Sequence, residues 1–235
     1  LEGGIVDEIL VREGDIVEKG QPLIKLKRTE IDASVSMIQG QLWAKTAKSA
    51  RLRAESRMVE TIEWPETLQA KQDRPEVEDA MQMEAAIFES RKKALAGKIS
   101  LLNSQVAQLQ EKAAGAEEEL SAQQDIIATL KEEIGAKQSL LEEDYIDKTQ
   151  ILELKRRLAE RKGRAGRLRQ DIAETRKKME ELKLRIVNLR DTYQEEAIGE
   201  LGKVQDIIFE LKDQLRPKVD AMERLTITAP VSGEV

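Results

Sequence analysis

The stretch LLEEDYIDK, residues 140–148, separates two long segments in which apolar residues recur every three or four positions. Within this stretch the apolar period stops, three acidic residues follow one another at 142–144, and Tyr145 and Ile146 stand as an isolated apolar pair. A short break between two long helices is typical of an antiparallel hairpin. The sequence therefore predicts that residues 140–148 form the turn of a helical hairpin.

Both flanking segments carry heptads, which predict a coiled coil because the apolar spacing alternates strictly between four and three. On the N-terminal side the series is Met81, Ala85, Phe88, Lys92, Leu95, Ile99, Leu102, Val106, Leu109, Ala113, Ala116, Leu120, Gln123, Ile127, Leu130 and Ile134. On the C-terminal side it is Ile151, Leu154, Leu158, Arg161, Ala165, Leu168, Ile172, Thr175, Met179, Leu182, Ile186, Leu189 and Tyr193. A stutter through Ala197 and Leu201 follows, which locally unwinds a supercoil, and the series resumes at Val204, Ile208, Leu211 and Leu215.

The register of the hairpin follows from opposing the two series. Centring the turn near Asp144 brings the two series into layers, as in Leu120 with Leu168 and Leu109 with Met179. A shift of one heptad would oppose Ile134 to Arg161. We therefore predict the first register.

Three helices are expected, over about 32–60, 76–142 and 149–216, with Pro217 ending or kinking the last one. The first has a weaker series, formed by Val35, Ile38, Leu42, Ser49, Leu52 and Val59. Residues 61–75 contain two prolines and no strong period, so they are predicted to be irregular. The second and third helices are each roughly 100 Å long. The first helix must then run alongside the other two. This predicts a three-helix layer at one end and a two-stranded coiled coil toward the turn. Trp43 and Trp64 are predicted to be packing residues of the three-helix layer.

The sequences at the two ends of the chain are typical of β-strands joined by turns. Residues 3–27 combine runs of β-branched residues with turn sequences at 13–15 and 19–22. Residues 226–235 (TITAPVSGEV) show the same pattern. A few strands at either end cannot stand alone. The expected fold is mainly α with a small β domain, in which a long antiparallel coiled-coil hairpin and a shorter third helix are inserted into a split β domain. The expected boundaries are 1–28 for the first β half, 29–225 for the helical domain and 226–235 for the second half.

The composition excludes several classes of function. The 235 residues include no Cys and no His, so disulfides, thiolate chemistry and the commonest general base are missing, and we expect no enzyme and no cofactor. The acidic runs at 117–119 and 142–144 point in different directions on a helix, so no metal site is expected. The net charge of −6 and the scarcity of aromatic residues disfavour nucleic acid as a partner. The sequence contains no run of 18 apolar residues, so no membrane span is predicted.

A basic run lies in the segment after the predicted turn. Eight basic residues fall between positions 155 and 169. One interpretation is an acidic partner, such as the helix of a neighbouring copy. The favoured interpretation is a solvated outer face, because surface charges are common on such helices.

The β halves resemble the split lipoyl-like domain of bacterial periplasmic adaptor proteins, also called membrane fusion proteins. The resemblance is carried by residues 4–6 (GIV), 11–17 (VREGDIV), 19–23 (KGQPL) and 228–235 (TAPVSGEV). Biotinyl and lipoyl carrier domains share this half-motif, but they place a modifiable Lys on a tight hairpin between the halves. Here the helical insertion, beginning at residues 27–30, replaces that hairpin, so a carrier function is rejected.

Within that family the chain looks most like the haemolysin D-type adaptors of type I secretion systems. Supporting stretches are residues 50–55 (ARLRAE) with Trp64-Pro65, residues 88–91, and residues 154–156 running on to Gly163 and Gly166. The resemblance implies a periplasmic adaptor that links an inner-membrane ABC transporter to a TolC-like outer-membrane channel and through which a secreted polypeptide passes. It also implies a hexameric ring, and flanking parts outside this sequence: an N-terminal inner-membrane helix and a β-barrel domain.

In the family the hairpin tip meets the channel. Efflux adaptors carry there an Arg, a Leu four positions on and a Ser seven beyond it. Alignment places Ala136, Leu140 and Asp147 on these positions, so only the Leu is kept, with Lys137 or Lys148 as candidates for the charge. The resemblance thus implies docking residues at Leu140, Leu141, Asp144, Tyr145, Ile146, Asp147, Lys148 and Thr149. The alternative is that the Tyr145-Ile146 pair caps the last layer of the coiled coil.

Two other functions remain open from the sequence. The chain could be an adaptor for small-molecule efflux, which the transporter it pairs with in cells would decide. It could also be a coiled-coil scaffold without a transport role. The scaffold explains the heptads but not the split half-motif, which requires the two ends of the chain to meet.

Overall fold

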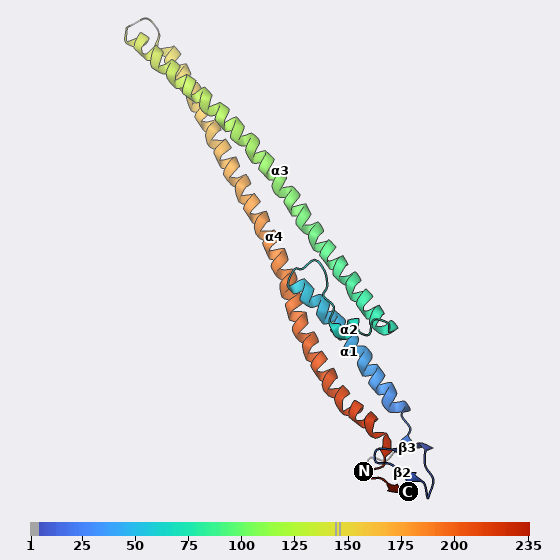
Figure 1. Ribbon diagram of the computed structural model, residues 1–235. Coiled ribbons are helices and arrows are strands. Elements are labelled where there is room, and N and C mark those ends of the chain that lie inside the picture. The colour runs from blue at the N-terminus through green and yellow to red at the C-terminus, as the bar shows by residue number, and fades with distance from the viewer. Residues whose placement is uncertain (1–4, 144, 146) are drawn as a thin grey trace. The chain divides into compact units, whose positions relative to one another are not determined.

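A computed structural model describes residues 5–143, 145 and 147–235, and shows long helices with short strands from both ends of the chain (Figure 1). The chain divides into two compact units. Residues 5–92 and 192–235 form the first, here called the split unit, and residues 93–191 belong to the second, the hairpin unit. Within the described residues no helix is both long and apolar enough to cross a membrane.

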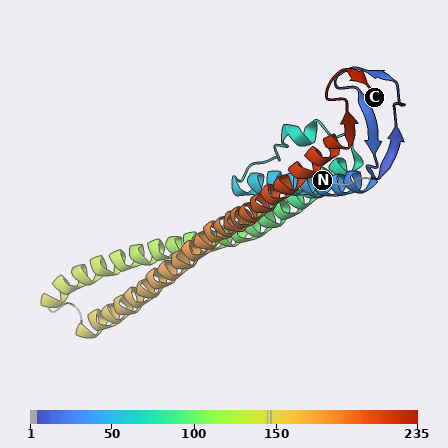
Figure 2. The same ribbon diagram turned by 90° about the horizontal axis from the view of Figure 1, so that it is seen from below.

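The β structure of the split unit joins the two ends of the chain. Strands β1 (Val6–Ile9), β3 (Pro22–Leu26) and β4 (Thr226–Thr228) form one antiparallel sheet in the order β1-β3-β4. Strands β2 (Ile16–Val17) and β5 (Gly233–Glu234) form a second antiparallel pair. Figure 2 shows these strands together. The prediction that the two β halves meet is therefore confirmed.

Helix α1 (Thr29–Ser56) begins and ends a few residues earlier than predicted. Its last turn closes with a Schellman motif: the N–H of Met58 donates to the carbonyl of Glu55 (3.1 Å), and the N–H of Val59 donates to that of Ala54 (3.2 Å). Met58 has a left-handed φ of 54°, which turns the chain away from the helix axis. Val59 is consequently exposed, so its assignment to the buried series of this helix was wrong.

Replacement of Met58 by Gly is expected to raise the free energy of unfolding by up to about 1 kcal/mol, because a residue with a Cβ is strained in the left-handed region and Gly is not. The matched control is Met37→Gly, at an exposed position inside α1. It should lower the same quantity by about 1 kcal/mol. Urea titration checks both, and equal losses from the two variants would show that Met58 is not strained.

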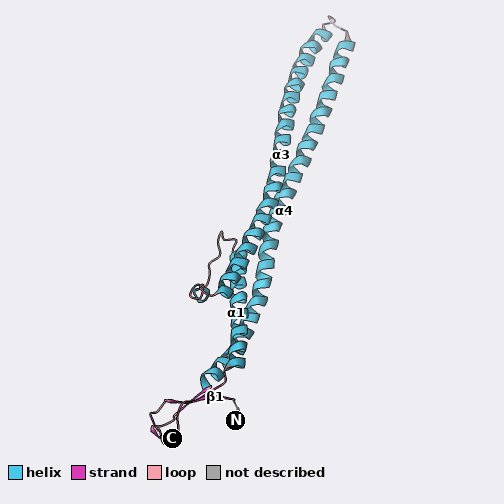
Figure 3. Cartoon of the chain, turned by 90° about the vertical axis from the view of Figure 1, so that its right-hand side faces the viewer, coloured by secondary structure: helices cyan, strands magenta, loops and turns pink. Residues whose placement is uncertain are grey.

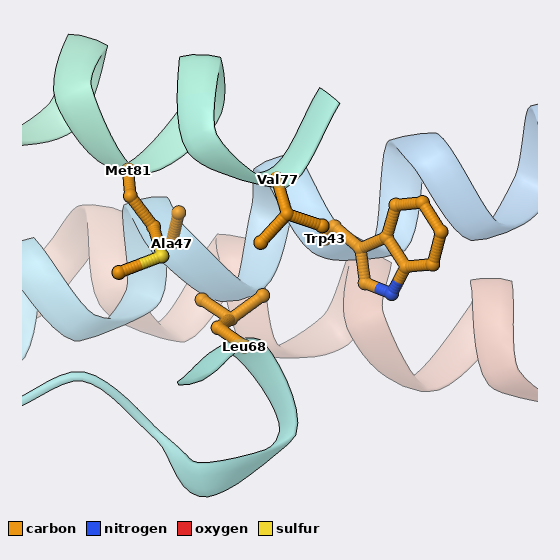
Figure 4. Close-up of a cluster of buried hydrophobic side chains, with 5 residues drawn as sticks. All are labelled: Trp43, Ala47, Leu68, Val77 and Met81. Atoms are coloured by element: carbon orange, nitrogen blue, oxygen red, sulfur yellow. The ribbon is translucent and has the colours of Figure 1, made fainter. Parts of the chain in front are cut away.

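Residues 61–75 are more ordered than predicted, because they contain the one-turn helix α2 (Glu66–Gln69). Pro65 precedes it in an extended conformation, and Leu68 is completely buried. Leu68 packs in a cluster with α1 and α3, shown in Figure 4 and formed by Trp43, Ala47, Leu68, Val77 and Met81, with Trp64 and Ala80 against it. The prediction that both tryptophans are packing residues is confirmed.

Helices α3 (Pro75–Glu142) and α4 (Lys148–Arg224) carry the predicted heptads. Every heptad position named above, from Met81 to Leu215, is buried or half-buried, which confirms the pattern. The predicted end of the last helix near 216 was wrong, since Pro217 lies inside α4. Pro217 is exposed, whereas Leu215, Val219 and Met222 continue a half-buried face, so packing outweighs the hydrogen bond that proline cannot donate.

Two ion pairs in the hairpin unit support the predicted register. Arg164 pairs with Glu119, and Arg176 pairs with Glu117 at 2.8 Å. With Leu120 opposite Leu168, each arginine reaches about five residues along α3, roughly 7.5 Å, in opposite directions. A shift of one heptad either way would place one of these pairs about 18 Å apart along the axis.

In the split unit, α1 packs against both long helices, as Figure 3 shows. Its contact with α4 is formed by Leu52, Ala197 and Val204, with Leu201 and Ile208 against them. The predicted three-helix layer is therefore present in this unit. The stutter falls where α4 packs against α1 as well as α3, which requires a wider apolar face than a two-helix seam.

Candidate functional site: the hairpin turn

The predicted docking residues lie at the link between α3 and α4. Leu140 and Leu141 belong to the last turn of α3, and Lys148 and Thr149 to the first turn of α4. Tyr145 and Asp147 lie between the helices. Asp144 and Ile146 lie outside the described residues.

Asp147 is the N-cap of α4, a role that the sequence reading did not assign. Its Oδ1 accepts the backbone N–H of Thr149 (2.9 Å) and the Thr149 hydroxyl (3.0 Å), and its carbonyl accepts the N–H of Gln150 (3.2 Å). Asp at this position satisfies N–H groups that the helix leaves unpaired. An Asp directly before a long periodic segment is the signal that could have identified the cap.

The same hydrogen bonds keep Asp147 charged. The donated backbone N–H of Thr149, followed by its hydroxyl, holds the pKa of Asp147 below its ordinary value. The contribution of the cap to α4 is therefore present above the pKa of Asp in the unfolded chain. It is lost as the pH falls through the lowered pKa of the folded state.

Tyr145 presents its ring to solvent. Its backbone N–H donates to the carbonyl of Leu140 (3.0 Å), but 74% of Tyr145 is exposed, as is 42% of Leu140. The apolar layers next to the turn are filled by Ile134, Ile151 and Leu154, all buried. Tyr145 therefore does not cap the last layer of the coiled coil, and the link between α3 and α4 carries an exposed aromatic residue.

The two lysines near the turn differ in whether they form an ion pair. Lys137, one candidate for the positive charge that the family resemblance implies at the tip, pairs with Glu133 on its own helix at 3.3 Å. Within the described part of the chain, Lys148 forms no ion pair. Lys148 is also exposed, so its ammonium group is the one available to a partner at the turn.

A buried charge network in the split unit was missed by the sequence reading. Glu55 is completely buried, and its carboxylate faces Arg51 at 2.7 Å and Arg91 at 3.3 Å. Arg51 also pairs with Glu84, and Arg91 with Glu196 at 3.1 Å. The network thereby connects α1, α3 and α4.

The network sets the charge states of its members. Burial works against the charged guanidinium of Arg51, but its hydrogen bonds to Glu84 and Glu55 hold its pKa above the ordinary value. Burial, with the nearby Glu55 carboxylate, raises the pKa of Tyr193, whose ring lies 5.4 Å from the Arg91 guanidinium. Only the Arg51–Glu55 spacing of four residues is visible in the sequence. The other contacts join separate helices.

Comparison with known proteins identifies relatives along the whole chain. The family model described as "AprE, long alpha-helical hairpin" matches residues 31–221. The type I secretion system membrane fusion protein PrsE of Rhizobium meliloti (strain 1021) is 34% identical over 235 residues, which are 100% of this chain and 54% of PrsE. The alkaline protease secretion protein AprE of Pseudomonas aeruginosa (strain PAO1) is 30% identical, over 99% of this chain and 54% of that protein. The chain thus spans about half the length of the curated relatives it matches.

Two solved structures resemble the fold of this chain. The soluble domain of LipC, a membrane fusion protein of a type I secretion system, superposes with a TM-score of 0.91 at 25% identity, covering 99% of this chain and 87% of LipC. The periplasmic adaptor protein EmrA has a TM-score of 0.60 at 20% identity, covering 99% of this chain and 62% of that chain. The likeness to EmrA concerns the fold alone.

Proposed function

The chain belongs to the AprE family of long α-helical hairpins, and from this premise we propose that it is the adaptor segment of a type I protein secretion machine. In this role it links an inner-membrane ABC transporter to a TolC-like outer-membrane channel, so that a polypeptide crosses both membranes in one step. The chain acts by assembly, and ATP hydrolysis belongs to the transporter. The names of the relatives, which are secretion and membrane fusion proteins, support this function.

Two parts of the chain have different roles, one in forming a ring of copies and the other in docking to the channel. Residues 1–28 and 226–235 are the two halves of a lipoyl-like domain, and residues 29–225 form the hairpin domain. The pairing of β2 with β5 and of β3 with β4 supports this division, because it joins the two halves. In the assembled machine the lipoyl-like domains pack into a hexameric ring in the periplasm, anchored to the inner membrane by a helix outside this sequence.

The observation that carries the docking role is the exposed ring of Tyr145 beside exposed Leu140. An exposed aromatic side chain that its own chain does not bury is the type of side chain that dominates protein interfaces. The docking surface consists of the residues implied by the family resemblance, with Asp147 and Thr149 also holding the start of α4.

Substitution of Tyr145 by Ser in the full-length protein is expected to reduce secretion of the substrate at least about tenfold, because an interface anchor of this kind contributes 2 kcal/mol or more. Tyr145→Phe should retain most of the secretion, since the ring supplies most of the buried area. The matched control is Leu101→Ser, at an exposed position on α3 away from the turn. Secreted protein is measured against the cellular level of each adaptor variant.

Photo-crosslinking from position 145 in cells identifies the partner directly. A TolC-like channel subunit in the crosslinked product is the expected result. Crosslinks to other copies of the adaptor alone, together with normal secretion by Tyr145→Ser, would remove the turn as the docking site.

A further inference from the structure

A hollow in the hairpin unit lies on one flank of the seam between α3 and α4. It has a volume of about 420 Å³ and is lined by Gln124, Ile127, Ala128 and Lys131 of α3 and by Lys162, Ala165 and Arg169 of α4. These described lining residues include three cations and no carboxylate, so we call it the cationic hollow. Each of the three cations follows directly after a heptad position, which places it beside the seam.

The three cations of the hollow have no carboxylate within reach on their own helices. On an α-helix, the neighbours of a side chain are the residues three and four positions away. Here those positions hold only apolar residues or glycine: Ile127, Ala128, Ile134 and Gly135 around Lys131, Leu158, Ala159, Ala165 and Gly166 around Lys162, and Ala165, Gly166, Ile172 and Ala173 around Arg169. By contrast, Lys137 and Lys178 each have a glutamate four positions away and pair with it.

The carboxylates of α3 nearest to Arg169 are already engaged by other arginines. In the register described above, Arg169 lies level with Glu119. Glu119 pairs with Arg164, and Glu117 pairs with Arg176 at 2.8 Å. Within the part of the chain that the structure describes, none of the three cations of the hollow forms an ion pair. The chain itself therefore does not neutralise the charge of the hollow.

A fourth cation, Arg161, lies in the seam next to the cationic hollow. It occupies a heptad position and is half-buried, and its Nη1 donates to Oε1 of buried Gln123 (3.3 Å), which is a neutral group. Ala165, which is one turn further along α4, lines the hollow and is 1% exposed. Among the described residues, no carboxylate pairs with Arg161 either. Its charge adds to the positive potential of the hollow.

Like charges around a concave and partly apolar surface favour the binding of an anion. Buried Ala165 and half-buried Ile127 contribute apolar walls, and walls of low dielectric constant concentrate the electric field within a cleft. Neighbouring like charges also destabilise the helices that carry them. An anion in the hollow removes this repulsion, because it contacts cations of α3 and of α4 at once.

We propose that the cationic hollow is a binding site for a small free anion with two or more negative charges, of the phosphate class, and that the bound anion bridges α3 and α4. Ammonium groups contact such a ligand as point charges, whereas the guanidinium of Arg169 can present two N–H groups to two phosphate oxygens. A hollow of this size holds a phosphate ion together with several water molecules. The inference does not depend on the proposed function, since it concerns a ligand of the hairpin itself.

Isothermal titration calorimetry of the purified chain with inorganic phosphate, at an ionic strength held constant with sodium chloride, measures the affinity. Saturable binding of one phosphate per chain is expected. Lys162→Gln with Arg169→Gln should weaken this binding at least tenfold, because each substitution removes a charged hydrogen-bond donor. The matched control, Arg156→Gln with Arg167→Gln, makes the same change in net charge at exposed residues of α4 outside the hollow and should weaken binding less than twofold.

A substitution that fills the hollow separates the site from the overall charge of the flank. Ala128 lines the hollow and is exposed, so Ala128→Leu keeps every charge and occupies part of the space. It should weaken phosphate binding at least tenfold. Ala122→Leu, at an exposed position of α3 outside the hollow, is the matched control and should leave the affinity unchanged. Circular dichroism verifies that both variants retain their helices.

Hydrogen exchange locates the bound phosphate along the chain. Phosphate should slow amide exchange in residues 124–131 and 162–169, relative to chloride at the same ionic strength. A second hollow in the hairpin unit serves as an internal control. It is larger, with about 610 Å³, but Arg190 is the single cation among its described lining residues. Exchange in residues 96–107, which line it on α3, should therefore not change.

Three results would each overturn the proposal. The first is the lack of saturable phosphate binding by the unmodified chain. The second is equal weakening by the two double variants, which would indicate a diffuse layer of counterions along the helix. The third is retained affinity in Ala128→Leu, which would place the anion outside the hollow. These measurements use purified chain and do not report secretion, so their outcome is independent of the substitutions at Tyr145.

Discussion

Replacement of Glu55 by Ala is expected to lower the free energy of unfolding of the split unit by about 3–5 kcal/mol, the range for removing one partner of a buried ion pair. The side chain of Glu55 is 0% exposed and faces Arg51, which is itself buried, and Arg91. Without this carboxylate, the buried guanidinium group of Arg51 retains only Glu84 as a partner. Unfolding in urea, followed by the fluorescence of Trp43 and Trp64, measures this unit, because both tryptophans lie in it.

The matched control is Glu60→Ala. The carboxylate of Glu60 pairs with Lys92, and the side chain of Glu60 is 86% exposed. An exposed pair of this kind contributes little to stability, because water screens it. A loss from Glu55→Ala as small as that from Glu60→Ala would show that the buried network does not hold the three helices together. Glu55→Gln keeps the shape without the charge and separates the loss of packing from the loss of charge.

Replacement of Leu52 by Ala is expected to cost about 2–5 kcal/mol, because the contact of α1 with α4 depends on this side chain. Leu52 is 2% exposed and packs against Ala197 and Val204. Ala197 is too small to fill the space that the substitution leaves. The same urea titration measures the effect, since Trp43 lies on α1.

The control for Leu52 is Leu184→Ala, which removes the same atoms from an exposed position on α4 and should change the free energy of unfolding by about 0.5 kcal/mol or less. Comparable losses from both leucines would mean that α1 is not held by its contact with α4. In that case the three-helix layer would depend on the cluster around Leu68 instead.

The parts of the fold that the sequence predicted are those that follow from a repeating local pattern. The heptads located the buried positions of α3 and α4 because a two-helix seam repeats with the same period as the sequence. The register followed from the same pattern, with Leu120 opposite Leu168, since a slip of one heptad would oppose Ile99 to Glu196 instead of Leu189. The docking residues at the turn came from family resemblance, and their role stays a prediction.

The parts that the sequence did not predict depend on contacts between elements. The end of α1 is set by Met58 in a left-handed conformation that its residue type disfavours. Pro217 is tolerated because α4 keeps its packed face on both sides of it. The pairing of Glu55 with Arg91 joins residues on two helices whose relative rotation cannot be read from either sequence period.

The antiparallel pairing of β3 with β4 also determines the order in which the chain can fold. Pro22 pairs with Thr228, so a ribosome adding about 5–20 residues per second completes the partner strand roughly 10–40 s after the first one. Loop-closure entropy opposes such a distant pairing until the helical hairpin has formed and has brought the two ends close together. The sheet should therefore close last, and any surface that includes it becomes available only to a chain whose hairpin is already folded.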